Sequence, residues 1–318
     1  MLRLTDVSQV PDDFGPSVVT IGNFDGVHRG HAALLASVVG RARETGLRSA
    51  AVTFDPHPLA VLYPDKAPSL IESLPEKLDR MADIGLDVAL VLPFTRELAA
   101  MTPEEFVREV FVRGLHARHI VVGRDTRFGV KNSGNVDTLR QLSRASGFEV
   151  QVLADVGTGH RYSSTQVRER LAAGDVEGAA AVLGRPHEVG GIVVRGLRRG
   201  HELGFPTANL CEEVSGMVPA DGVYAGWLVR DDKSADDPDH RMPAAISVGT
   251  NPTFDDVLQR TVEAHVIDRD DLDLYGEAVH VQLVQRLRGN TRFESIDALV
   301  TQIGADVDQA RQILRGTA

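Results

Sequence analysis

The chain has 318 residues, of which 42% are hydrophobic and 25% are charged, and this length exceeds the usual size of one domain. Its net charge of −11 at pH 7 comes with no basic excess in either half, which argues against a protein that wraps nucleic acid. No window reaches the roughly 20 apolar residues of a membrane helix, and the start resembles no secretory signal. Cys211, the single cysteine, excludes an intrachain disulfide and a cysteine zinc cluster. We therefore expect a cytoplasmic protein that binds neither nucleic acid nor membrane.

The first half alternates short β-rich runs with helical patterns. The runs lie at residues 18–21, 50–54, 88–92, 119–123 and 149–153, and the helical patterns include residues 75–84, 103–115 and 136–145. Apolar strands that alternate with helices predict a parallel sheet covered by helices, an α/β fold. Ligands of such sheets bind beyond the carboxyl ends of the strands, where this half places its polar turns. These turns are residues 22–31, 55–58 and 123–129.

The pattern changes near residues 184–186. β-patterned runs follow at residues 189–194, 222–229, 244–248, 261–267 and 279–284, with no helix of useful length between them. They predict an all-β domain, an antiparallel barrel or sandwich. The acidic segment 231–239 is too polar to bury and is predicted to be a mobile hairpin loop. We place the two domains at residues 1–183 and 187–318.

One apolar helical stripe closes the chain. It consists of Ile296, Leu299, Val300, Ile303, Val307, Ala310 and Leu314. Because these residues share one face at helical spacing, we expect a C-terminal helix that packs on the barrel.

The turn at residues 22–31, GNFDGVHRGH, joins a predicted strand to a predicted helix. Gly22 and Gly26 would let backbone N–H groups approach a phosphate, and the following helix N-terminus adds a favourable dipole. His28 and His31 can both donate to phosphate oxygens from the first helical turn. A plain helix cap or a two-histidine metal site would explain the same histidines. The glycines, the aspartate and the position after a strand favour an anion site.

This turn resembles the H-x-G-H signature of nucleotidyltransferases, in the form seen in bacterial FMN adenylyltransferases. T-F-D-P-H-P at residues 53–58, V-G-R-D-T-R-F-G at 122–129 and S-S-T-Q-V-R at 163–168 follow in that family's order and spacing. The last of these would alone be a weak signal, more often a helix cap. The resemblance implies a Rossmann-like domain with His28 and His31 as catalytic residues. It implies an ATP site of Gly22, Phe24, Asp25, Gly26, His28, His31, Ser164, Thr165 and Arg168, and flavin or nucleotide contacts from Asp55, Asp125 and Phe128.

The second half resembles riboflavin kinases. R-G-x-x-L-G-F-P-T-A-N-L at residues 199–210 is followed by G-V-Y-A at 222–225, G-T-N-P-T-F at 249–254, V-E-A-H at 262–265 and D-L-Y-G at 273–276. The resemblance implies that Thr207 and Asn209 hold the Mg²⁺ of ATP, a role that suits hard oxygen donors, and that Glu263 is the catalytic base. It further implies an ATP site of Gly196, Arg199, Gly200, Phe205, Pro206, Thr207 and Asn209. Arg288 is assigned to flavin contact, with a plain surface arginine as the alternative.

Together the two halves resemble the bifunctional riboflavin kinase/FAD synthetase family of bacteria. The resemblance implies that the barrel phosphorylates riboflavin to FMN with ATP, releasing ADP. The first domain would then adenylylate FMN to FAD and release pyrophosphate. Mg²⁺ or another divalent cation would assist both steps. The chain departs from the family at Thr126, Tyr162 and Ala264, of which Thr126 leaves the packing of the flavin ring open.

Three other functions compete with this interpretation. The chain could be a nucleotidyltransferase for another phosphate substrate with an accessory barrel, a flavin-sensing protein without catalysis, or a tRNA-charging enzyme. The riboflavin kinase motifs disfavour the first, the retained catalytic residues the second, and the acidic charge the third. A homo-oligomer is compatible with the sequence.

Overall fold

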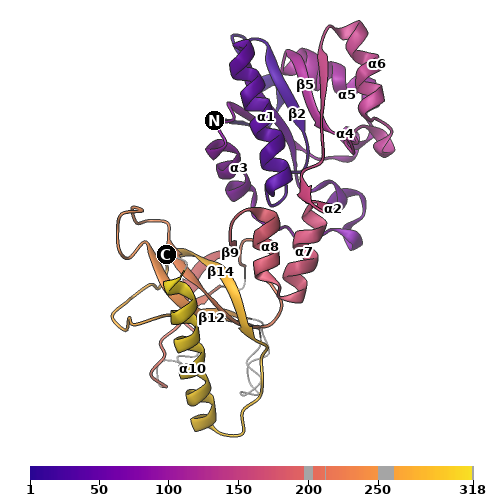
Figure 1. The fold of residues 1–318 in the computed structure, drawn as a ribbon. Helices are drawn as coiled ribbons and strands as arrows, with labels where there is room; N and C mark the ends of the chain where they lie inside the picture. The colour runs from indigo at the N-terminus through magenta and orange to yellow at the C-terminus, as the bar shows by residue number, and fades with distance from the viewer. Residues whose placement is uncertain (197–202, 212, 250–260, 317–318) are drawn as a thin grey trace. The chain divides into compact units, whose positions relative to one another are not determined.

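The computed structural model describes residues 1–196, 203–211, 213–249 and 261–316. It divides into two compact units, Met1–Ser163 and Ser164–Ala318. Each unit has a sheet of its own (Figure 1).

The first unit is built on a six-stranded sheet in the order β1-β4-β3-β2-β5-β6, with every neighbouring pair parallel. Its strands are β1 Leu2–Leu4, β2 Ser17–Ile21, β3 Arg48–Asp55, β4 Val88–Pro93, β5 Ala117–Gly123 and β6 Glu149–Leu153, and a small hairpin adds β7 Gly157–Thr158 and β8 His160–Arg161. Its α-helices are α1 Arg29–Thr45, α2 Pro58–Leu62, α3 Leu74–Asp83, α4 Arg96–Ala100, α5 Pro103–Phe106 and α6 Val136–Ser146. The short 3₁₀ helices are η1 Val7–Gln9, η2 Pro64–Lys66 and η4 Val130–Asn132, and the π-helix η3 spans Val107–Gly114.

Helices cover both faces of this sheet, as the apolar strands require. Leu35 of α1 and Met81 of α3 belong to one buried cluster, whereas Phe111 of η3 and Leu139 of α6 belong to a second. The parallel α/β fold predicted from the sequence is therefore confirmed. The edge strand β1 was not predicted, since three residues are too few to show a period.

The helix predicted at residues 103–115 changes type along its length. It begins as α5 and continues as η3, in which the amide of Leu115 reaches back five residues to the carbonyl of Val110 at 3.0 Å. The buried residues of η3, Val107, Val110, Phe111 and Gly114, keep the spacing of an α-helical face, so sequence periodicity cannot distinguish the two windings.

The direction in which the chain adds strands reverses beside β2. Strands β3 and β4 extend the sheet on one side of β2, and β5 and β6 extend it on the other. Such a switch point leaves a crevice outside the carboxyl ends of β2 and β5, where α/β proteins bind their ligands. The turns after β2 and β5 are two of the three predicted from the sequence to bind substrate.

The second unit is a closed antiparallel barrel in the order β10-β13-β12-β11-β14-β9. Its strands are β9 His187–Val194, β10 Ala208–Leu210, β11 Gly222–Arg230, β12 Arg241–Gly249, β13 Thr261–Val266 and β14 Ala278–Arg288, and its helices are α7 Ser164–Ala173, α8 Val176–Leu183 and α10 Ile296–Arg315. Of the two predicted architectures, the barrel is confirmed. The short β10 was missed as a strand, although it closes the barrel between β9 and β13.

The C-terminal helix α10 packs on the barrel, as its apolar stripe predicts (Figure 1). Val307, Ala310 and Leu314 form a buried cluster with Trp227 of β11. Ile296 is the exception within the stripe, because it lies 57% exposed at the first turn. The acidic segment 231–239 connects β11 to β12 and is a hairpin loop, as predicted.

A buried ion pair also fastens α10 to the barrel. Arg288 at the end of β14 donates from Nε to both carboxylate oxygens of Asp306 at 3.0 Å, and a second nitrogen of its guanidinium donates to Oδ2 at 2.7 Å. The Asp306 side chain is 5% exposed and that of Arg288 is 23% exposed. Arg288 is therefore not the plain surface arginine considered as its alternative role.

Removing one member of this pair should destabilise the barrel. We expect Asp306→Ala to lower the free energy of unfolding by about 3 kcal/mol, because it leaves the Arg288 charge without its partner. Denaturant unfolding followed by the fluorescence of Trp227, the only tryptophan, measures the change. Asp308→Ala, which removes an exposed carboxylate from the same helix, should change stability by no more than about 0.5 kcal/mol. Equal effects of the two variants would show that the buried pair adds nothing.

Candidate active sites

The carboxyl edge of the parallel sheet brings two of the predicted motifs together. Asn23 follows β2 and His57 follows β3, and Asn23 Nδ2 lies 3.2 Å from His57 Nε2. His57 also caps α2, since its Nδ1 accepts from the amide of Leu59 at 3.2 Å. The T-F-D-P-H-P segment thus forms one side of the turn that carries His28 and His31.

The glycines of this turn make room for neighbouring side chains. A Cβ added at Gly22 would lie 3.0 Å from the ring of Phe24, and one at Gly26 would lie 3.0 Å from Ile71. Gly26 also has a φ of +81°, a backbone conformation that favours glycine. The structure therefore gives both residues a packing role besides the phosphate contact predicted from the sequence.

His28 is the N-cap of α1, and this contact fixes its tautomer. Its Nδ1 accepts from the amides of Gly30 at 3.1 Å and His31 at 3.3 Å. A ring nitrogen that accepts carries no proton, so the proton of a neutral His28 is on Nε2, which is then a donor. The helix-cap alternative is correct as local structure and is compatible with phosphate binding.

His31 lies between two rings. Its ring stacks on that of His28 with centroids 3.7 Å apart and meets the ring of Phe24 edge-on at 5.2 Å. Burial, followed by the nearby charges of His28, Arg161 and Lys77, lowers the pKa of His31 well below its usual value. Its Nδ1 is buried and has no hydrogen-bond partner among the described residues. A neutral imidazole with an unsatisfied buried nitrogen is typical of a ligand site.

The two predicted aspartates near this turn differ in exposure. Asp25 is 5% exposed, and its carboxylate accepts from the amide of Ile71 at 3.0 Å, so it holds the segment before α3. Asp55 is exposed at the carboxyl end of β3. Burial lowers the pKa of Lys77, whereas the charges of both carboxylates act to raise it. Lys77 was not predicted from the sequence, because a lysine within an amphipathic helix is normally a solvated residue.

The turn after β5 carries Asp125 and Phe128. Arg161 lies 2.6 Å from Oδ2 of Asp125. Burial acts to raise the pKa of Asp125, but the hydrogen bond and charge of Arg161 outweigh it and lower that pKa. Phe128 is 4% exposed and packs against Phe106 in the core, so its predicted flavin contact stays a prediction. Arg161 was not predicted from the sequence, although it stands just before the S-S-T segment.

Ser164, Thr165 and Arg168 lie in the first turns of α7, in the second unit. That helix is hydrogen-bonded to another segment of its own unit, since the amide of Ala220 donates to the carbonyl of Leu171 at 2.9 Å. Their predicted grouping with His28 and His31 stays a prediction.

The glycine packing predicts the effect of a small substitution. We expect Gly22→Ala to lower the rate of the chemistry at this turn by about tenfold, since the displaced Phe24 ring moves His31 and small misplacements in active sites are costly. Gly40→Ala is the control, because no atom lies within 4 Å of a Cβ at that position of α1 and alanine is the better helix former. Steady-state rates of the two variants measure the difference. Equal rates would contradict the packing role of Gly22.

A second polar cluster lies on the barrel, around Glu263 of β13. Thr261 Oγ1 donates to Oε1 of Glu263 at 3.0 Å, and Thr207 Oγ1 donates to Oε2 at 3.4 Å. Asn209 Nδ2 donates to Thr207 Oγ1 at 3.1 Å. Asn209 and Glu263 face each other across β10 and β13, so their side chains share one face of the sheet.

Other residues predicted for this site lie beside the cluster. A Cβ at Gly196 would lie 2.7 Å from the Asn209 amide, so this glycine allows the chain to pass close to it. Pro206 and Thr207 line a cavity of about 80 Å³. Phe205 meets the ring of His265 edge-on at 5.4 Å. Arg199 and Gly200 lie outside the described residues.

The oxygen donors of this cluster fit a magnesium ion. Mg²⁺ prefers a few protein oxygens and completes its shell with water and substrate phosphates. Thr207 and Asn209 offer a hydroxyl and a carbonyl oxygen next to a carboxylate, without nitrogen or sulfur ligands that would favour a softer metal. In the described part of the chain, no three His, Cys, Asp or Glu side chains gather as a metal site.

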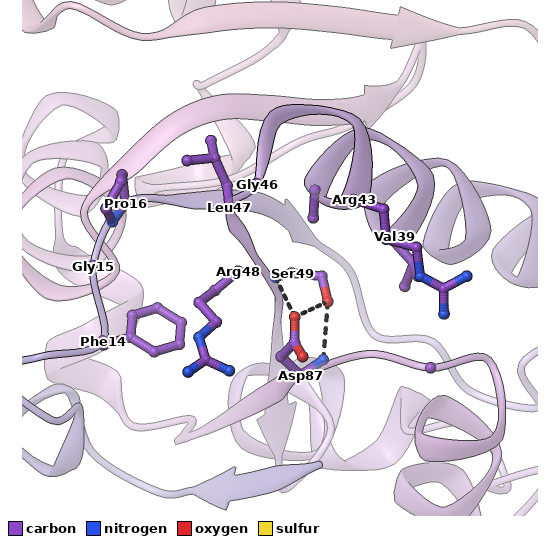
Figure 2. Close-up of a pocket in the computed structure, with 12 residues that line it drawn as sticks. Phe14, Gly15, Pro16, Val39, Arg43, Gly46, Leu47, Arg48, Ser49 and Asp87 are labelled. Atoms are coloured by element: carbon purple, nitrogen blue, oxygen red, sulfur yellow. Dashed lines mark hydrogen bonds between the residues drawn. The ribbon is translucent and has the colours of Figure 1, made fainter.

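A second cavity lies in the first unit. Its volume is about 470 Å³, and it opens at the amino ends of β3 and β4. Figure 2 shows Asp87 and Ser49 at its centre, where Ser49 Oγ donates to Asp87 Oδ2 at 2.7 Å. None of the residues predicted to bind substrate lines this cavity. The hydrogen bond joins the start of β3 to the segment before β4.

Two protein families match successive parts of the chain. The FAD synthetase family matches residues 10–166, and the riboflavin kinase family matches residues 183–314. The bifunctional riboflavin kinase/FMN adenylyltransferase of Escherichia coli (strain K12) is 37% identical, with 96% of this chain and 95% of the relative covered. The chain belongs to the bifunctional riboflavin kinase/FMN adenylyltransferase family. The enzyme of that name from Pseudomonas fluorescens is 38% identical over 95% of this chain and 94% of its own.

A solved structure is also similar over the full length. It is named a macrolide-efflux protein from Streptococcus pneumoniae, is 30% identical, covers 98% of each chain, and has a TM-score of 0.84. Within the described part of this chain, no helix is both long enough and apolar enough to span a membrane.

The bifunctional riboflavin kinase/FMN adenylyltransferase interpretation made from the sequence is thus confirmed. The chain carries riboflavin kinase and FMN adenylyltransferase activities, uses ATP, and forms FMN and FAD. The riboflavin kinase match over the barrel removes the alternative of an accessory domain.

Proposed function

We propose that the two reactions of this bifunctional enzyme take place at the two clusters described above. The riboflavin kinase reaction belongs to Glu263, Thr207 and Asn209, and the FMN adenylyltransferase reaction belongs to the turn of His28 and His31. The observation that carries the proposal is the Glu263 carboxylate, which Thr261 and Thr207 hold at 3.0 and 3.4 Å opposite Asn209. A carboxylate fixed beside oxygen donors is what a phosphoryl transfer from ATP requires.

In the kinase reaction, Glu263 accepts the proton of the riboflavin 5′-hydroxyl as that oxygen attacks the γ-phosphate of ATP. The two threonine hydroxyls orient the carboxylate, so little reorganisation is needed at the moment of transfer. Thr207 and Asn209 would hold the magnesium ion, which when bound neutralises phosphate charge. Gly196, Arg199, Gly200, Phe205 and Pro206 would complete the ATP site, and Arg288 would contact the flavin from its position beside Asp306.

In the adenylylation reaction, a phosphate oxygen of FMN attacks the α-phosphate of ATP, and pyrophosphate leaves. A phosphate monoester is already anionic, so no general base is needed. His28 donates to phosphate oxygens through Nε2, the nitrogen that its capping contact leaves protonated. The neutral His31 donates from the adjacent position, and both stabilise the charge that develops.

The other predicted residues complete this second site. Ser164, Thr165 and Arg168 of α7 would bind the triphosphate, and Arg161 would act with them through its charge near His31. Gly22, Phe24, Asp25 and Gly26 would shape the turn. Asp55, Asp125 and Phe128 would contact the flavin or the nucleotide.

We further propose that residues 1–183 carry the adenylyltransferase and residues 187–318 the kinase. The two family matches, to residues 10–166 and 183–314, support this division. The same proposal includes a cytoplasmic location and the absence of nucleic-acid and membrane partners, and it allows a homo-oligomer.

A time course tests the division of the reactions. The purified protein is incubated with riboflavin, ATP and Mg²⁺, and the three flavins are separated at intervals. FMN should appear first and then decline as FAD forms, whereas EDTA should stop both steps. Lasting riboflavin would contradict the kinase assignment, and FMN that never becomes FAD would contradict the adenylyltransferase assignment.

A further inference from the structure

Lys77 is a buried lysine to which neither of the proposed mechanisms assigns a role. Lys77 lies on α3 and is 9% exposed, although a lysine is almost never buried unless it is paired. Lys66 and Lys131, by contrast, are exposed in the same unit. The chain has 34 lysines and arginines in all. Among the described residues of the first unit, Lys77 is the one lysine or arginine that is buried.

The ammonium group of Lys77 is joined to the turn that carries His28 and His31. Its Nζ donates to the carbonyl of Asn23 at 3.2 Å and to Thr53 Oγ1 at 3.2 Å. Thr53 Oγ1 donates to the same carbonyl at 3.1 Å. Asn23 O thus receives two hydrogen bonds, one from α3 and one from β3. This contact fixes the backbone at the point where the turn leaves β2.

The backbone directly after Asn23 needs such support. Phe24 has a φ of 51° and Val27 a φ of 31°, which are uncommon for residues with a side chain and strained for the β-branched valine. The Phe24 ring is 1% exposed and forms one side of the His31 environment. A shift at Asn23 would therefore reach His31 through the Phe24 ring.

A buried ammonium is costly, so an apolar residue of similar length would be the simpler way to fill the space. Burial lowers the pKa of Lys77, while the charges of Asp25, Glu72 and Asp55 act in the opposite direction. The positive charge also acts on His31, whose pKa it helps to lower. Lys77 therefore affects both the geometry and the charge of the turn.

We propose that Lys77 is a positioning residue for FMN adenylylation, which holds the Asn23 carbonyl and thereby the Phe24 and His31 rings in their reactive arrangement. Thr53 is its partner in this role. The inference rests on the proposed function of the His28 and His31 turn. It differs from that proposal in that Lys77 touches neither ATP nor FMN.

The test uses the full-length enzyme and measures both activities on each variant. Lys77→Met should lower kcat for FMN adenylylation by about 100-fold, the usual effect of a misplaced catalytic group, with smaller changes in the KM values for ATP and FMN. Riboflavin phosphorylation in the same protein should stay at the wild-type level. Lys66→Met, which removes an exposed lysine of the same unit, should leave both activities unchanged.

A pH profile separates positioning from a merely structural role. Removing the Lys77 charge takes away one of the causes that lower the His31 pKa, so that pKa should rise towards its ordinary value. His31 would then become protonated at a higher pH than in the wild type. The inflection of the adenylylation profile that follows the titration of His31 should accordingly move to higher pH in Lys77→Met and stay in place in Thr53→Val, which keeps the charge.

If Lys77→Met does not fold, Thr53→Val tests the same proposal. It removes one hydroxyl without a large change of shape, and it should lower adenylylation in the same direction by a smaller factor. Wild-type adenylylation in both Lys77→Met and Thr53→Val would overturn the inference. A loss confined to the KM for ATP would also overturn it, because Lys77 would then be a direct ligand.

A parallel His31→Gln variant distinguishes the two proposals. If His31→Gln loses adenylylation while the Lys77 and Thr53 variants keep it, only the positioning role of Lys77 fails. If His31→Gln keeps full adenylylation, the proposed function of the turn fails.

Discussion

Glu263→Ala should abolish the conversion of riboflavin to FMN while FMN is still converted to FAD. General-base catalysis contributes about 10²- to 10⁴-fold, and we expect kcat for riboflavin phosphorylation to fall by at least about 10²-fold. Assays that begin from riboflavin and, separately, from FMN measure the two activities of the same preparation.

Glu263→Gln refines this test. Glutamine keeps the shape of the side chain and one oxygen that can accept from a threonine hydroxyl, and its amide group can donate to the other hydroxyl once that hydroxyl rotates. The local packing is therefore kept while the base is lost. Glu263→Gln should accordingly be almost as inactive as Glu263→Ala. Glu294→Gln, at an exposed position of the same unit, should be fully active. A kinase rate in Glu263→Gln near that of the wild type would show that Glu263 is not the base.

The double variant His28→Ala/His31→Ala should have the opposite effect. FMN should accumulate from riboflavin and FAD formation should fall by at least about 10³-fold, because two donors to the developing phosphate charge are lost and each is worth about 10²- to 10³-fold. The same pair of assays measures this result.

The capping role of His28 requires a control for stability. His28→Asn retains a side-chain oxygen that caps α1 well, whereas His28→Ala costs about 1 kcal/mol of helix stability. Adenylylation lost in His28→Asn, with unfolding unchanged, would assign the effect to catalysis. His116→Asn, at an exposed position of the same unit, should be neutral. If either active-site variant lost both reactions while folded, one reaction per site would be wrong.

The sequence predicted the fold of both units because their patterns are local. The apolar strands between helices required a parallel sheet with two covered faces, and the β-runs after residue 184 required an antiparallel barrel or sandwich. Closure as a barrel depended on the three-residue strand β10, which no local period could reveal. The strand β1 was missed for the same reason.

The sequence also determined which residues to examine, because the motifs of both reactions are contiguous segments with fixed order. The local roles were decided by contacts between segments far apart along the chain. Gly22 and Gly26 serve the packing of Phe24 and Ile71, which spacing could not show. His28 caps its own helix and is thereby fixed as an Nε2 donor.

Lys77 shows what only the tertiary structure decided. In the sequence it is a lysine within an amphipathic helix, a place where a solvated side chain is normal. Its burial and its contacts to Asn23 and Thr53 arise because α3 packs on the face of the sheet where β2 and β3 end. Burial and long-range contacts depend on how the elements pack, whereas a sequence pattern reports only the face of the element on which a residue lies.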